Sequence, residues 1–339
     1  MRLPLRTVIT TGIGGGGHMD NRPAPRPIVI AHRGCSGERP EHTLAAYARA
    51  IDQGADVIEP DLVPTRDGIL VARHENEIGG TTDVAGRADF AARRTTKTID
   101  GQAVTGWFVE DFTLAELKTL RARERLPELR PANTAFDGRF EIPTLAEIIA
   151  LAKARGVGIY PETKHPTYFA GIGLGTDAPL VAALHAAGWS GPDDPVFVQS
   201  FEVDNLKRIA GLTRLRLIQL MDGHGGPADG AVPSYAMMAT PGGLRAVAAY
   251  AYGIGPNKAQ LGQGELVREA HAAGLRVHPW TFRAENPFLA APFQRDGAQG
   301  DLAGEIAAAL RLGIDGFFTD HPLIGVQTRD AVAKESRNA

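Results

Sequence analysis

Three carboxylates at strand-like positions are the first residues whose types and spacing suggest chemistry. Glu59 and Asp61 stand two apart in DVIEPDLV, and Glu162 begins the triplet ETK. Residues two apart on a strand point to the same face, so Glu59 and Asp61 should point together. Three carboxylates that converge in a closed interior are too costly to leave unpaired. The pattern therefore predicts a divalent cation at these oxygens, and such ligands favour Mg²⁺ or Ca²⁺ over Zn²⁺.

The alternative for the Glu59–Asp61 pair is two solvated carboxylates at the edge of a sheet. The neighbouring residues Val57, Ile58 and Leu62 are apolar. They indicate a buried strand, which favours the convergent arrangement over the solvated one.

Two histidines and two cations occupy similar positions near strand ends. His32 and Arg33 end the run PIVIAHRG, His74 ends GILVARHE, and Lys164 follows Glu162 by two residues. A single histidine is more often a core residue than a catalyst, but two beside one carboxylate cluster favour acid–base roles, since imidazoles titrate near neutrality. Arginine binds phosphate through a two-pronged hydrogen bond and lysine as a point charge. Together these groups suit phosphoryl-ester chemistry.

The elements that must position these side chains alternate between apolar strands and amphipathic helices. A helix is predicted after Thr43, and another from Thr144, where Glu147 completes a capping box and Gly156 ends the helix. Nearly all-apolar strands between such helices imply a parallel sheet covered on both faces. Counting residues 56–74 as one position gives eight strands, which predicts a TIM-type (β/α)8 barrel. The main alternative is an open doubly wound sheet.

One segment interrupts this alternation. Residues 75–140 are too long for an ordinary connection and are predicted to form an inserted subdomain after the second strand, over the carboxyl end of the barrel. A short helix is expected within it at residues 113–124. The predicted organisation is a flexible leader at residues 1–26, the barrel with its insertion at 27–328, and a tail at 329–339.

Composition excludes several classes of protein. The chain of 339 residues has 36 Lys plus Arg against 39 Asp plus Glu, a balance that argues against a nucleic-acid partner. A single cysteine excludes an intramolecular disulfide and a multi-cysteine zinc site. No run approaches the roughly 20 apolar residues of a membrane helix, so no stable membrane insertion is expected. The N-terminus is a poor signal peptide, which favours a cytoplasmic location and leaves a periplasmic or secreted one, and the oligomeric state, open.

Taken in order, these blocks resemble the glycerophosphodiester phosphodiesterases. The resemblance spans about residues 27 to 325. The motifs that carry it are His32-Arg33-Gly34, Pro40-Glu41-His42-Thr43, the run from Gly54 to Asp61, the turn from Thr65 to Gly68 with His74, the Glu162–Lys164 triplet, Pro279 to Thr281, and Thr319 to Pro322.

The resemblance implies hydrolysis of small-molecule glycerophosphodiesters to an alcohol and sn-glycerol 3-phosphate. It implies metal ligation by Glu59, Asp61 and Glu162. It also implies His32 and His74 as the acid–base pair. In the expected route, the glycerol hydroxyl of the substrate attacks phosphorus, and water opens the resulting cyclic phosphate.

The resemblance also implies binding roles. Arg33 and Lys164 would hold the phosphate, Trp280 and Phe282 would form an apolar wall, and Glu41 would orient the first-strand residues and a metal-bound water. Two positions depart from the family pattern: His42 stands where asparagine is usual, and Glu75 follows His74 where aspartate is commoner. The histidine puts the local hydrogen bonding of its loop in doubt, whereas Glu75 keeps a carboxylate.

Two rival functions remain at this stage. One is a lysophospholipase D or sphingomyelinase D-like enzyme that uses the same site with a pocket for an acyl tail. The other is a non-catalytic barrel that binds a phospho-ligand. That barrel would normally have lost a histidine or a carboxylate, whereas this chain keeps His32, His74, Glu59, Asp61 and Glu162.

Overall fold

The computed structural model describes residues 26–338. All of the predicted leader except Arg26 therefore lies outside the described residues. Of the residues predicted as a tail, 329–338 continue a C-terminal helix, α11 (Pro322–Asn338), and Ala339 lies outside the described residues.

Within residues 26–338, eight parallel strand positions form a closed ring. Phe282 pairs with Thr319 in a parallel bridge, and the amide of Phe318 donates to the carbonyl of Pro279 at 3.0 Å, so the last two positions meet. The predicted (β/α)8 barrel is confirmed. In order, its strands are β1 (Ile28–His32), β2 (Val57–Glu59) with β3 (Asp61–Pro64), β7 (Gly158–Ile159) with β8 (Glu162–Thr163), β9 (Phe197–Ser200), β10 (Arg216–Met221), β11 (Gly253–Pro256), β12 (Arg276–Val277) and β13 (Gly316–Thr319).

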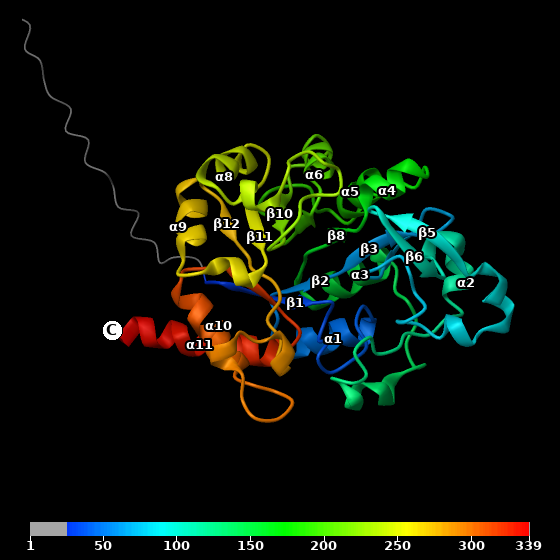
Figure 1. The fold of residues 1–339 in the computed structure, drawn as a ribbon, viewed down its shortest axis with the longest axis horizontal. Helices are drawn as coiled ribbons and strands as arrows, with labels where there is room; N and C mark the ends of the chain where they lie inside the picture. The colour runs from blue at the N-terminus through cyan, green and yellow to red at the C-terminus, as the bar shows by residue number, and fades with distance from the viewer. Residues whose placement is uncertain (1–25, 339) are drawn as a thin grey trace, which may run out of the picture.

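Helices cover the outside of this ring (Figure 1). The predicted capping box is confirmed, since Thr144 accepts from the amide of Glu147 and the Glu147 carboxylate accepts in return. Gly156 ends that helix with a φ of 65°. That helix is α3 (Leu145–Arg155). The other helices around the ring are α1 (Leu44–Asp52), α4 (Pro166–Gly171), α5 (Asp177–Ala186), α6 (Val203–Ala210), α7 (Tyr235–Met238), α8 (Pro241–Ala248), α9 (Glu265–Ala272) and α10 (Leu302–Arg311), with short 3₁₀ turns η5 (Lys258–Leu261), η6 (Asn286–Phe288) and η7 (Ala291–Phe293).

Prolines divide two of the strand positions just before a carboxylate. Pro60 separates β2 from β3 and precedes Asp61, while Pro161 precedes Glu162 at the start of β8. Proline lacks the N–H that a regular ladder needs. Its carbonyl still accepts here: the amide of Glu162 donates to Pro60 at 2.9 Å. The neighbouring strands are thus held in register at the two ligand positions.

The barrel interior is filled by aromatic and branched side chains below its carboxyl end. Tyr160 stacks on Phe197 with ring centroids 4.9 Å apart, and Phe318 contacts Tyr160 edge to face. Ile30, Val57 and Ile218 complete this buried layer. The layer closes the barrel from beneath, so a ligand must enter at the carboxyl ends of the strands.

The insertion begins with a return strand and continues as an irregular subdomain. β4 (Leu70–Ala72) runs antiparallel to β3, with Leu62 opposite Ala72, and brings the chain back to His74. The expected helix at 113–124 is shorter than predicted, because Ala122 is drawn into a bridge with Thr82. The other elements of the insertion are η1 (Val84–Gly86), η2 (Ala88–Arg93), β5 (Thr95–Ile99), β6 (Gln102–Gly106), η3 (Val109–Asp111), α2 (Leu114–Leu117) and η4 (Pro131–Phe136).

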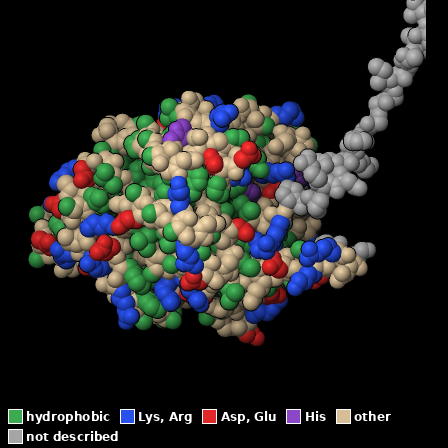
Figure 2. Space-filling model, turned by 180° about the vertical axis from the view of Figure 1, so that it is seen from behind, with side chains coloured by type: hydrophobic (Ala, Val, Ile, Leu, Met, Phe, Trp, Pro, Cys, Tyr) green, Lys and Arg blue, Asp and Glu red, His purple; other side chains and the backbone are tan. Residues whose placement is uncertain are grey.

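The surface carries both signs of charge. Figure 2 shows Lys and Arg side chains interspersed with Asp and Glu on one face, in keeping with the near balance of the composition. Figure 1 places β5, β6 and α2 of the insertion at the opposite end of the view from α9 and α11. In the part of the chain that the structure describes, no helix is both long enough and apolar enough to span a bilayer.

Candidate active site

A cavity of about 360 Å³ opens at the carboxyl ends of the barrel strands. Seven of the predicted site residues line it: His32, Arg33, Glu59, His74, Glu162, Lys164 and Trp280. The insertion contributes Arg125 and Leu126 to the same wall. These residues from four strand positions and the insertion therefore meet in one place, as the predicted convergence requires.

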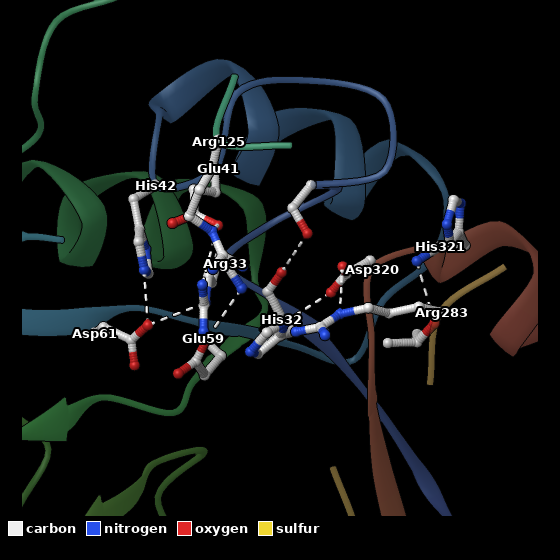
Figure 3. A network of polar contacts seen from close by, with 12 residues as sticks. His32, Arg33, Glu41, His42, Glu59, Asp61, Arg125, Arg283, Asp320 and His321 are labelled. Atoms are coloured by element: carbon white, nitrogen blue, oxygen red, sulfur yellow. Dashed lines mark hydrogen bonds and ion pairs between the residues drawn. The ribbon is translucent and has the colours of Figure 1, made fainter. Parts of the chain in front are cut away.

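The three predicted ligands form a buried carboxylate cluster. Glu59, Asp61 and Glu162 each offer an oxygen within 4.8 Å of the others, and their exposed fractions are 1%, 1% and 5%. Each is also held from the protein side. The backbone N–H of Arg33 and the amide of Gln199 donate to Glu59 at 2.9 and 3.0 Å. His42 donates to Asp61 at 2.9 Å (Figure 3). The Lys164 ammonium lies 2.7 Å from Glu162.

Electrostatics make this cluster unfavourable without a cation. Burial, together with the charges of Asp61 and Glu162, raises the pKa of Glu59 well above its usual range. Burial likewise raises the pKa of Glu162 to about 8, against the opposing charge of Lys164. For Asp61 burial acts in the same direction, but Lys164 and Arg33 outweigh it and hold the pKa well below its usual range. Two carboxyl groups therefore favour protons.

Three convergent oxygen donors that compete for protons fit a hard divalent cation, which would replace those protons. The donor set contains no sulfur or imidazole, so it favours Mg²⁺ or Ca²⁺ chemistry over Zn²⁺. Three carboxylates against Arg33 and Lys164 leave one excess negative charge, which a divalent cation reverses. The cluster can thus attract an anionic substrate once a cation is bound.

His32 is oriented by an aspartate from the last strand. Its Nδ1 lies 2.6 Å from Asp320 Oδ1, so Nδ1–H donates and Nε2 is left with a lone pair. Asp320 is itself held by Arg283 at 3.0 Å (Figure 3). It is also held by Arg130 at 2.5 Å. Burial and the charge of Arg33 lower the pKa of His32 to about 3. His32 is therefore a neutral imidazole with a fixed tautomer.

A second chain of contacts holds His74. Its Nδ1 lies 2.7 Å from Glu75, the other oxygen of Glu75 contacts His165 at 3.2 Å, and His165 contacts Asp100 at 2.6 Å. Asp100 belongs to the turn between β5 and β6. Burial and the charges of Arg33 and Lys164 lower the pKa of His74. The insertion thus supplies Asp100 behind one histidine and Arg130 behind the other.

The His165 contact predicts a pH-dependent contribution to stability. Burial opposes the charged imidazole, but hydrogen bonds to Asp100 and Glu75 outweigh it and raise the pKa of His165 to about 9. A raised histidine pKa gives stability that is full below the unfolded pKa, near 6.5, and is lost as the pH rises through 9. Asp100→Asn is expected to lower the free energy of unfolding by about 1 to 3 kcal/mol at pH 6.

Urea denaturation at pH 6 and at pH 10 measures this effect. The difference between Asp100→Asn and the parent should shrink toward zero at the higher pH. Asp193→Asn removes the same charge at an exposed position and serves as the control. A loss of stability that is equal at both pH values would contradict the ion-pair account.

Of the residues predicted to bind substrate, Arg33 and Trp280 line the cavity, and Glu41 contacts Arg33. Arg33 is buried, with its guanidinium 3.0 Å from Glu41 and 3.1 Å from Asp61. Glu41 lies behind Arg33 and also accepts from Arg125 at 2.9 Å. The Trp280 indole donates to the carbonyl of Gly255 at 2.8 Å, which fixes its ring in the cavity wall.

Phe282 is not brought to this cavity. It is 1% exposed and packs edge to face on Phe317, with ring centroids 5.8 Å apart. Strand alternation from Trp280 predicts a shared face, but regular β12 ends at Val277, so the alternation does not extend this far.

His42 keeps a role in the hydrogen bonding of its loop. Its backbone has a φ of 56°, a left-handed conformation in which asparagine and histidine are both enriched. Nε2–H donates to Asp61, and Nδ1 accepts from the Tyr47 hydroxyl at 2.8 Å. At this position the histidine therefore places a hydrogen-bond donor on a predicted metal ligand.

Sequence reasoning missed several residues of the site. Gln199 and Phe201 both line the cavity, and a polar residue in the apolar run PVFVQSF was a usable signal for the first. Asp320 contacts His32, although it was not among the predicted site residues. Arg125 and Arg130 come from the irregular insertion, where no periodic pattern indicates which side chains turn inward.

Comparisons with known proteins agree with this geometry. Residues 32–324 match the model of the glycerophosphoryl diester phosphodiesterase family. A glycerophosphodiester phosphodiesterase of Arabidopsis thaliana is 36% identical over 319 residues, covering 87% of this chain and 84% of the relative.

Solved structures share the fold. A glycerophosphoryl diester phosphodiesterase structure from Silicibacter pomeroyi has a TM-score of 0.67 at 23% identity, covering 91% of this chain and 95% of the other. A phosphodiesterase of Oleispira antarctica, solved with the product sn-glycerol-3-phosphate, has a TM-score of 0.63 at 23% identity, covering 90% and 97%. The carboxylate cluster, the barrel and these matches lead to one conclusion: the chain belongs to the glycerophosphoryl diester phosphodiesterase family and is a phosphoric diester hydrolase.

Proposed function

We propose that this enzyme hydrolyses glycerophosphodiesters to an alcohol and sn-glycerol 3-phosphate, with His32 and His74 as acid and base. One observation carries the proposal: His32 and His74 line the same cavity as Glu59 and Glu162, although they come from distant parts of the chain. The product bound by the Oleispira antarctica phosphodiesterase supports the assignment.

Glu59, Asp61 and Glu162 are the residues that would hold a divalent cation. When bound there, Mg²⁺ or Ca²⁺ supplies positive charge that stabilises the phosphate as it becomes more anionic. Arg33 and Lys164 add fixed positive charge beside the same carboxylates. Because Arg33 is already paired with Glu41 and Asp61, its guanidinium is held in place before substrate arrives.

The histidines account for proton transfer in two steps. In the first, one imidazole takes the proton of the glycerol hydroxyl as its oxygen bonds to phosphorus. The other imidazole must carry a second proton before this step. It gives that proton to the leaving alcohol oxygen, and a cyclic phosphate results. In the second step the roles reverse, since the imidazole that gave its proton now takes one from the water that opens the ring. Asp320 and Glu75 hold the Nδ1 side of each ring, so Nε2 is the working nitrogen of His32.

An assay of sn-glycerol 3-phosphate release from glycerophosphocholine, with Mg²⁺ or Ca²⁺ added, tests the activity. A substrate analogue that lacks the attacking glycerol hydroxyl tests the cyclic route. Glycerophosphocholine should be cleaved and the analogue should not. Cleavage of both compounds would leave the hydrolase and exclude the cyclic phosphate, whereas cleavage of neither would contradict the proposed function and favour a binding barrel.

Asp320→Asn is expected to lower kcat by about 10- to 100-fold with little change in KM, because an amide can favour the wrong imidazole tautomer. The kcat–KM split and the pH profile measure this effect, since loss of the carboxylate also alters the pKa of His32. Asp301→Asn, a helix-cap aspartate outside the cavity, is a suitable control. A variant that unfolds more easily but keeps the parent kcat would show that Asp320 is only structural.

A further inference from the structure

A further cavity, of about 350 Å³, adjoins the catalytic one and has no part in the proposed mechanism. Four residues line both cavities: Glu162, Lys164, Phe201 and Asp222. Phe201 directly follows strand β9 and Asp222 directly follows β10, so the two cavities open at the same end of the barrel. We call this further one the side cavity.

The side cavity holds two carboxylates that lack a cationic partner among the described residues. Its cations Lys164 and His165 are each paired with another carboxylate of the wall, at 2.7 and 2.6 Å. Glu202 is 2% exposed and accepts only from the backbone N–H and the hydroxyl of Thr167 within residues 26–338. Asp222 accepts through Oδ1, which leaves Oδ2 without a described partner. The wall therefore has negative charge to spare.

Tyr235 adds a buried polar group that no described residue satisfies. Its side chain lines the side cavity and is 6% exposed, yet its hydroxyl makes no hydrogen bond in the described part of the chain. Buried polar groups normally have a partner, so this hydroxyl is available to a ligand. The Tyr235 ring meets Phe201 edge to face with centroids 6.0 Å apart, and Phe201 meets Trp280 likewise at 5.7 Å. An aromatic wall thus runs from the catalytic cavity into the side cavity.

We propose that the side cavity binds the cationic end of the leaving alcohol, so that the enzyme prefers glycerophosphodiesters of amino alcohols such as choline and ethanolamine. This inference rests on the proposed function. In these substrates a short ethylene linker joins the phosphate ester to the ammonium group. With the phosphate beside Lys164, the linker would extend past Phe201, and the ammonium group would lie between Asp222 and Tyr235. Aromatic rings and carboxylates together are the groups that attract organic cations.

A second metal ion fits the side cavity less well than an organic cation. Among the residues that the structure describes, three ligand groups converge within 4.8 Å only at Glu59, Asp61 and Glu162. A hard divalent cation requires more oxygen ligands than Glu202 and Asp222 can supply. An uncharged or anionic alcohol would leave both of these carboxylates without a counter-charge. The occupant that satisfies the wall is therefore an organic monocation.

The experiment compares glycerophosphocholine with its neutral carbon isostere, glycerophospho-3,3-dimethylbutanol, by release of sn-glycerol 3-phosphate at saturating Mg²⁺ or Ca²⁺. The two leaving alcohols have the same shape and differ in charge. In the parent, kcat/KM should be higher for the choline ester by about 10-fold or more, the effect of a desolvated cation on an aromatic and acidic wall. Glycerophosphoethanolamine should also be preferred over the neutral isostere.

Two variants assign this preference to the side cavity. Asp222→Asn removes the charge but keeps an oxygen that can accept the N–H of Gly223, and it should lower the choline-to-isostere ratio by about fivefold. Tyr235→Phe should weaken the use of glycerophosphoethanolamine more than that of glycerophosphocholine, since only a primary ammonium can donate to the hydroxyl. Asp204→Asn is the matched control. It removes an exposed carboxylate on α6 that lines neither cavity, so it should keep the parent ratio.

Equal kcat/KM for the choline ester and its isostere in the parent overturns the side-cavity proposal and leaves the proposed function intact. A choline preference that is unchanged in Asp222→Asn overturns it as well, because the cation would then bind elsewhere. A parent that is inactive on every glycerophosphodiester overturns the proposed function and this inference with it. Should Asp222→Asn fail to fold, the parent ratio and the Tyr235→Phe comparison decide.

Discussion

Replacing His32 or His74 by alanine is expected to lower kcat for glycerophosphocholine by about 10²- to 10⁴-fold, the range for loss of a positioned acid or base. Both side chains line the cavity beside the carboxylate cluster, and each is backed by a carboxylate at Nδ1. Steady-state kinetics with saturating Mg²⁺ or Ca²⁺ measure the effect. His185→Ala, on the outer helix α5, should retain parent activity.

A change of the substrate's leaving group distinguishes the roles of the two histidines. A p-nitrophenolate leaving group needs no proton. On glycerophospho-p-nitrophenol, the variant that lacks the general acid should therefore recover much of its rate of p-nitrophenolate release in the first turnover. The variant that lacks the general base should stay slow on both substrates. Equal rescue of both variants would contradict the division of roles, and parent-like rates in both would remove the acid–base assignment.

Removal of divalent cations is expected to reduce hydrolysis to near background, and addition of Mg²⁺ or Ca²⁺ should restore it. Chelation by EDTA followed by titration of each ion measures this dependence. Glu59→Gln should weaken cation binding by about 10-fold or more, since it removes one charged ligand of three. An EDTA-treated enzyme with an unchanged rate would contradict the cation requirement.

In the absence of metal, Glu59→Gln should stabilise the folded protein. The raised pKa of the Glu59 carboxyl means that the folded state holds its proton more tightly than the unfolded state. Its ionisation therefore costs stability as the pH rises from about 4.5 through that raised value. One pKa unit corresponds to about 1.4 kcal/mol. In EDTA at pH 8, Glu59→Gln should unfold at a higher temperature than the parent, with no difference at pH 4.

The local hydrogen bonds permit this variant to fold. A glutamine at position 59 can still accept the N–H of Arg33. Its amide nitrogen would face Gln199, whose own carbonyl oxygen has no hydrogen-bond partner and can be turned toward it. A variant that is less stable than the parent in EDTA would show that the carboxylate cluster is not strained by its charge.

Local patterns predicted the barrel because each strand is short, apolar and followed by a helix signal. Thr144 with Glu147 marked a helix start, and the two-residue spacing of Glu59 and Asp61 placed both in one cluster. The alternation of side chains along a strand does not hold for Phe282, because the regular strand β12 ends at Val277. The Phe282 side chain lines a neighbouring cavity rather than the catalytic one.

Local sequence patterns could not predict the contacts between segments that are distant in the chain. Asp320 reaches His32 across 288 positions, and Arg130 reaches Asp320 across 190. Neither residue has a spacing that marks it, because only the closure of the ring brings β13 beside β1. The irregular insertion has no repeat from which the inward side of Arg125 or Asp100 could be read.

The insertion has a consequence for how far this enzyme can be simplified. Asp100 and Arg130 both belong to the inserted segment. They stand behind different imidazoles, Asp100 through His165 and Glu75 and Arg130 through Asp320. A minimal barrel made by deleting residues 75–140 would remove Glu75, Asp100 and Arg130, while the two histidines and three carboxylates would still be present in its sequence. Their alignment would be gone, so scaffold and catalyst in this protein are not separable modules.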